Sequence, residues 1–70
     1  MPLHERLASV FARMRRDNLR PLWAEGSIRD AIYLAGILSA IESQVADELN
    51  VESPWFDRDA FFAACEEETD

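Results

Sequence analysis

The sequence is poor in the residue types on which most enzyme and metal sites depend. It has one cysteine (Cys65), one histidine (His4), two glycines (Gly26 and Gly36) and no lysine. A single cysteine excludes an internal disulfide, and two isolated glycines exclude a glycine-rich loop that cradles phosphate. Metal sites and nucleophilic sites need several such side chains at matched spacing. The sequence therefore predicts a non-enzymatic protein with no metal and no cofactor.

A long hydrophobic segment is also missing. The most apolar stretch, residues 31–41, is interrupted only by Gly36 and Ser39, and it is shorter than the roughly 20 residues of a membrane-spanning helix. No signal-peptide pattern is present. We therefore expect a cytoplasmic protein of a bacterial host cell, with no membrane contact.

Charge is divided unevenly along the 70 residues. Fourteen acidic residues against seven arginines give a net charge of −7. Residues 1–35 hold six arginines and four acidic residues, whereas residues 36–70 hold one arginine and ten acidic residues. An acidic surface repels nucleic acid and attracts basic surfaces. We therefore expect the protein to bind a basic partner protein and not to bind nucleic acid directly.

Helical spacing of apolar residues predicts one all-α domain over residues 1–70, a compact three-helix domain with a long central helix and a short C-terminal helix. The expected helices cover about residues 3–19, 28–49 and 57–66. Because Pro21 disfavours a helical conformation at the preceding residue, the first helix should end near residue 19. Asp57 is suited to cap the third helix, with Phe56 and Phe61 in the positions of a hydrophobic staple.

The central helix begins at a capping-box pattern, in which Ser27 is followed three residues later by Asp30. It carries two apolar stripes. One stripe, at Leu34, Leu38, Ile41, Val45 and Leu49, is expected to face the other two helices. The second stripe and its small residues predict contact with a second copy of the chain, so we expect a homodimer. The residues predicted for this self-association are Ile32, Ala35, Gly36 and Ser39.

Two charged surfaces are candidates for binding other molecules. The acidic half predicts a surface that occupies the basic groove of a host nucleic-acid-binding protein. Its predicted residues are Glu42, Asp47, Glu48, Glu52, Asp57 and Asp59. The alternative is a dimeric structural or regulatory protein that touches nucleic acid through arginines at the end of the first helix. That alternative face comprises Arg13, Arg15, Arg16 and Arg20.

The C-terminal segment resembles the ending of many small phage and prophage proteins. These close on a helix of the form F-D-x-x-x-F-x-x-A-C, which is matched by Phe56, Asp57, Phe61, Ala64 and Cys65. The resemblance implies a mobile genetic element, in which small proteins often bind and redirect host machinery. It also implies a possible role among the small acidic inhibitors of bacterial defence complexes, of which anti-CRISPR proteins are one class.

Overall fold

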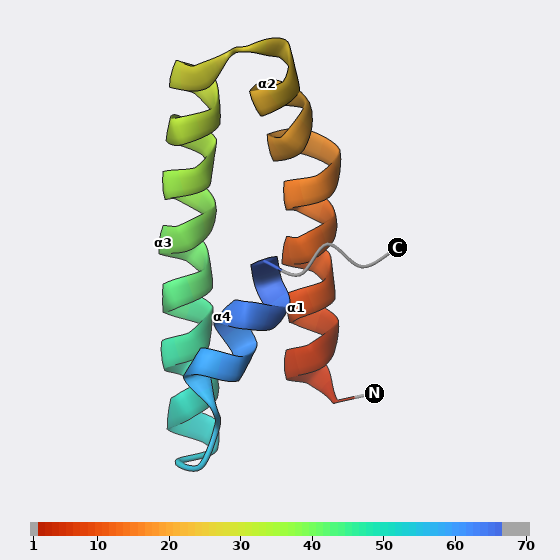
Figure 1. Cartoon of the computed structure of the whole chain (residues 1–70). Coiled ribbons are helices and arrows are strands. Elements are labelled where there is room, and N and C mark those ends of the chain that lie inside the picture. The colour runs from red at the N-terminus through yellow and green to blue at the C-terminus, as the bar shows by residue number, and fades with distance from the viewer. Residues whose placement is uncertain (1, 67–70) are drawn as a thin grey trace.

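The computed structural model describes residues 2–66 and confirms the predicted all-α domain of three helical rods (Figure 1). The first rod consists of α1 (Leu3–Met14), a π-helical turn η1 (Arg15–Leu19) and α2 (Arg20–Glu25), joined without a break. The long central helix α3 (Ile28–Glu52) runs back beside this rod. The short C-terminal helix α4 (Arg58–Glu66) crosses the half of this hairpin that contains the start of α1 and the end of α3.

The predicted end of the first helix before Pro21 is wrong, because helical structure continues to Glu25. Proline lacks an N–H group, and its ring clashes with the carbonyl four residues earlier in a regular helix. The turn before Pro21 is wider than an α-helical turn, and the Arg20 N–H bonds the carbonyl of Arg15, five residues back. Such single π turns are a known way of accommodating an irregularity inside a helix.

Gly26 reverses the chain between α2 and α3. Its φ of +82° is left-handed, a conformation that glycine adopts without a Cβ penalty. The Ser27 N–H bonds the Leu22 carbonyl at 2.9 Å, and the Gly26 N–H bonds the Trp23 carbonyl at 3.1 Å, as in a Schellman motif. Ser27 occupies the N-cap position of α3 as predicted, but its side chain makes no capping hydrogen bond. The backbone turn therefore defines this boundary instead of the expected capping box.

The start of α4 agrees with the sequence. The Ala60 N–H donates to the Asp57 carboxylate at 3.0 Å, which is the expected N-cap bond. The rings of Phe56 and Phe61 lie 5.6 Å apart between centroids, as a hydrophobic staple requires. Cap and staple together fix the angle at which the chain enters α4.

The core lies where α1, α3 and α4 meet, and it is built from small and aromatic side chains. Phe11 and Phe61 stack edge to face at 6.5 Å between centroids. Alanines on α1 and α3 are buried and let the backbones approach. The buried residues of this cluster are Ala8, Phe11, Leu38, Ala46, Phe61 and Cys65.

One charged side chain, Glu42, is buried in this core, which corrects its predicted place on an exposed acidic surface. Its exposed fraction is only 3%, whereas Ile41, predicted to face the core, is 43% exposed. Arg15 accounts for the difference, since its Nη2 donates to Glu42 Oε1 at 2.8 Å and its Nε donates to Oε2 at 3.2 Å. A bidentate arginine–carboxylate pair of this kind fixes orientation as well as charge. It ties the π turn to the middle of α3.

Within residues 2–66, no helix combines the length and apolar character needed to cross a membrane.

We expect loss of one member of the Arg15–Glu42 pair to be costly. Glu42→Ala leaves the Arg15 guanidinium buried without its partner, which costs roughly 3–5 kcal/mol of unfolding free energy. Replacing both residues by methionine should cost much less, because no buried charge then remains. Urea unfolding followed by circular dichroism measures both values. Asp47→Ala is the control, because it breaks the exposed pair with Arg58 and should cost less than about 1 kcal/mol. A Glu42→Ala effect as small as the control would contradict this role.

Candidate functional site

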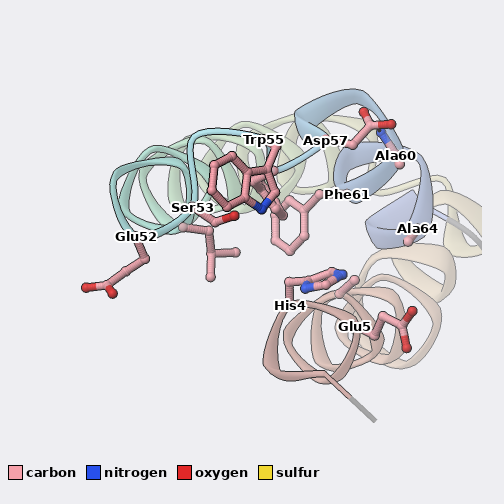
Figure 2. A pocket seen from close by; sticks show the side chains of 12 residues that line it. His4, Glu5, Glu52, Ser53, Trp55, Asp57, Ala60, Phe61 and Ala64 are labelled. Atoms are coloured by element: carbon pink, nitrogen blue, oxygen red, sulfur yellow. Dashed lines mark hydrogen bonds between the residues drawn. The ribbon is translucent and has the colours of Figure 1, made fainter.

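A groove opens between the start of α1 and α4, at the end of the molecule where α3 finishes (Figure 2). Its volume is about 600 Å³, which is in the range of pockets that hold ligands. Alanine, leucine and phenylalanine side chains form its walls, and carboxylates stand among its lining residues. The complete lining is His4, Glu5, Ala8, Leu49, Glu52, Ser53, Trp55, Phe56, Asp57, Ala60, Phe61 and Ala64.

Aromatic rings determine the shape of this groove. Phe56 lies against His4 at 5.6 Å between ring centroids and against Phe61 at the same distance. Trp55 stands on the opposite side from His4 in Figure 2 and is 87% exposed. A large amphipathic ring left in solvent beside an apolar hollow is typical of residues that become buried in an interface. Its exposure excludes Trp55 from the core.

Five of the six predicted acidic residues are exposed and gather at this same end. They come from the last turns of α3 and from the chain around the start of α4. We call this set the acidic end; it comprises Asp47, Glu48, Glu52, Asp57 and Asp59. Glu42 does not belong to it, because Arg15 holds that side chain inside the molecule. The predicted set therefore includes one residue whose carboxylate has a structural role, and the other five are exposed.

Two contacts set the charge available at the acidic end. Arg58 donates to Asp47 and also lies over the ring of Phe62, at 5.7 Å from the centroid. By contrast, none of the ion pairs among residues 2–66 involves Glu5, Glu52 or Asp57. These three carboxylates line the groove, so its edge carries negative charge that Arg58 does not neutralise.

The sequence did not identify the two α1 residues of the groove, His4 and Glu5, as binding residues. Both lie at the start of α1, about fifty residues away in sequence from the α3–α4 connection that lines the same groove. The hydrophobic staple at Phe56 was the available local signal. It predicted where α4 begins, but not that α1 would supply the other wall.

The residues predicted for self-association are largely uncovered by the chain itself. Ile32, Gly36 and Ser39 are exposed, and Ala35 is half-buried. A Cβ added at Gly36 would meet no atom within 4 Å. No other part of this molecule therefore packs closely against Gly36. Tyr33 and Ile37 beside it are also exposed. This half of α3 therefore presents an apolar face to solvent.

The four arginines of the alternative nucleic-acid face are not presented together. Arg13 and Arg20 are exposed, whereas the side chain of Arg15 is 12% exposed and engaged with Glu42. Arg16 pairs with Asp17 at 3.0 Å. Because Arg15 points into the fold, the predicted face loses the member nearest its centre.

Cys65 is fully buried among apolar side chains. Burial raises the pKa of its thiol to about 12, and the nearby Glu42 carboxylate adds to the rise while Arg15 opposes it. A thiol that stays protonated is a poor nucleophile. No group of three or more potential metal ligands occurs within the described part of the chain.

Comparison of the chain with protein-family models, with curated proteins and with solved structures finds no match. The resemblance of the C-terminal segment to phage proteins therefore stays a prediction. Any functional conclusion must come from the geometry of the groove, the acidic end and the exposed face of α3.

We expect the Cys65 thiol of the folded protein to resist alkylation. At pH 8, a pKa near 12 lowers the thiolate fraction about a thousandfold relative to an unfolded cysteine with a pKa of roughly 8.5. The raised pKa also means that the stability contributed by the neutral thiol is present below about pH 8.5 and is lost as the pH rises towards 12. Iodoacetamide labelling followed by mass spectrometry measures the rate. Ser9→Cys in a Cys65→Ala background should label fast, because position 9 is exposed; equal rates would contradict the burial of Cys65.

Proposed function

We propose that the protein is a non-enzymatic binding module that inhibits or modulates a host nucleic-acid-binding complex, in the manner of a phage or mobile-element inhibitor such as an anti-CRISPR protein. It acts through the acidic end. The observation that carries this proposal is the gathering of exposed carboxylates around a groove with a solvent-exposed tryptophan; those that line it come from α1, from the end of α3 and from the residue before α4.

The charge pattern supports a basic protein surface as the target. Proteins that hold nucleic acid present clustered arginines and lysines, and a carboxylate surface is complementary to such a cluster. Complementary charge raises the rate of encounter and selects the partner, while apolar and aromatic contacts at the centre supply much of the affinity. The acidic end combines both features, since Trp55 and the apolar groove lie among the carboxylates.

The test is a charge reversal with a control that is matched in helix position. Glu52→Lys with Asp59→Lys changes the acidic end, at the last residue of α3 and in the first turn of α4. Glu25→Lys with Asp30→Lys makes the same change in net charge at the opposite end, at the last residue of α2 and in the first turn of α3. The two double variants therefore have similar effects on helix dipoles.

Tagged wild type and both variants are used to capture proteins from a bacterial lysate, with and without nuclease, and the captured proteins are identified by mass spectrometry. We expect wild type to capture a nucleic-acid-binding host protein with or without nuclease treatment. The Glu25→Lys/Asp30→Lys control should capture the same amount of this protein. Glu52→Lys/Asp59→Lys should capture at least about tenfold less, because complementary charge is lost. Equal capture by both variants, or capture that disappears with nuclease, would overturn the proposal.

We further propose that the chain is a homodimer through the exposed apolar face of α3. Support comes from Ile32 and Tyr33, which are 60% and 63% exposed, and from the open space around Gly36. Large exposed apolar surfaces on a helix are typical of interaction sites. Since the acidic end lies at the far end of α3, a dimer formed here leaves that end accessible.

Ile32→Glu tests this interface without a cost to the fold, because the side chain is already in solvent. We expect light scattering coupled to size-exclusion chromatography to show a dimer for wild type and a monomer for the variant, with unchanged helical content. In the Ile32→Glu monomer, Gly36→Ala should raise the unfolding free energy by up to about 1 kcal/mol through helix propensity, because no atom of the chain lies within 4 Å of the added Cβ. A wild-type protein that remains monomeric at high concentration would contradict self-association and leave this face to another partner.

A further inference from the structure

The groove beside the acidic end has a composition that defines its occupant more closely than charge alone. Its floor is apolar, with Leu49 and Phe61 among the lining residues, and its edge carries Glu5, Glu52 and Asp57. An occupant must therefore bring apolar side chains for the floor and positive charge for the edge. We propose that the groove is the docking site for a basic amphipathic helix of the partner protein, which inserts apolar side chains between α1 and α4. This inference rests on the proposed function of the acidic end.

The charges argue against the other occupants of an apolar groove. A second copy that docked with its own acidic end would bring the same carboxylates against Glu5, Glu52 and Asp57, and the like charges would repel. Nucleic acid and anionic headgroups are disfavoured for the same reason. A cationic segment instead meets carboxylates that no described arginine neutralises. Charge complementarity therefore selects a basic protein segment.

The walls of the groove favour a helix as the bound form. The first turns of α1 form one side, and α4 with the end of α3 forms the other, so an inserted helix would pack against helices on both sides. Helices that bind in this way place apolar residues of one face into the groove and keep their charged residues at its edges. Ala60 and Ala64 lie one turn apart on α4 and both line the groove. Their small side chains leave space for an inserted helix.

Trp55 has a defined part in this mode of binding. It stands at the edge of the groove across from His4, with its ring in solvent. A docked helix would cover the ring, and an arginine of the ligand could stack on its face, which is a favourable cation–π geometry. Burial of Trp55 is therefore a direct report of occupancy.

The test uses synthetic peptides of about four helical turns, which are long enough to present apolar anchors at positions i, i+3, i+4 and i+7 on one face. One peptide contains leucine and arginine in an amphipathic order, a second has the same composition in an order that destroys the apolar face, and a third has glutamate in place of arginine. Binding is measured by fluorescence of the full chain carrying Trp23→Phe, so that Trp55 is the only tryptophan. We expect the amphipathic basic peptide to shift Trp55 emission to shorter wavelength. The other two peptides should bind at least about tenfold more weakly.

Groove filling provides the matched variants. Ala60→Phe places a ring in the groove from an exposed position on α4, and Ala40→Phe makes the same change at an exposed position of α3 that does not line it. We expect Ala60→Phe to weaken binding of the basic amphipathic peptide at least about tenfold, and Ala40→Phe to leave it unchanged. Circular dichroism checks that both variants keep their helical content.

The outcomes separate this inference from the proposed function. Equal binding of the amphipathic and reordered peptides, or unchanged binding by Ala60→Phe, would overturn the groove as a docking site, even if the acidic end still captured its host protein. No emission shift with any peptide would overturn it as well. Loss of capture by Glu52→Lys/Asp59→Lys concerns only the acidic end and is read in the separate lysate experiment.

Discussion

The Arg15–Glu42 pair connects the irregular part of the first rod to the middle of the central helix. Pro21 imposes a wide turn on that rod, and Arg15 is its first residue. The two hydrogen bonds from Arg15 to Glu42 hold this turn against α3. Cys65 lies close enough for both charges to affect its pKa, so the end of α4 belongs to the same cluster. An ion pair buried between rods disfavours alternative packings that would leave either charge unpaired.

The shortness of α4 gives the molecule two different surfaces. α4 has nine residues against 25 in α3, and it therefore covers only one half of the hairpin (Figure 1). At the covered half, α4 and α1 enclose the groove and bring the carboxylates of the acidic end around it. At the uncovered half, isoleucines and Tyr33 of α3 stay in solvent. The proposed partner and the proposed second copy thus use opposite ends of one small fold.

The sequence predicted helix boundaries well where the deciding contacts join residues close together in the chain. The Asp57 cap and the Phe56–Phe61 staple involve residues within one or two turns, and both form as expected. The prediction from Pro21 was wrong because the effect of a proline depends on whether the preceding turn can widen, as it does here. The predicted exposure of Glu42 was wrong for a related reason. Its place in an acidic sequence indicates solvent, but a partner 27 residues away turns it inwards. The groove was invisible to any local pattern, since its walls come from the two ends of the described chain.

Hydrogen–deuterium exchange of the full chain, with and without the host protein captured by the acidic end, tests the central claim most directly. Slowed exchange in the complex at residues 3–8 and 52–64, with no change at residues 20–31, is the result that the groove and acidic end predict. Protection confined to residues 13–31, at the arginine-bearing end of the hairpin, would contradict the proposed binding surface and place recognition at the opposite end of the molecule.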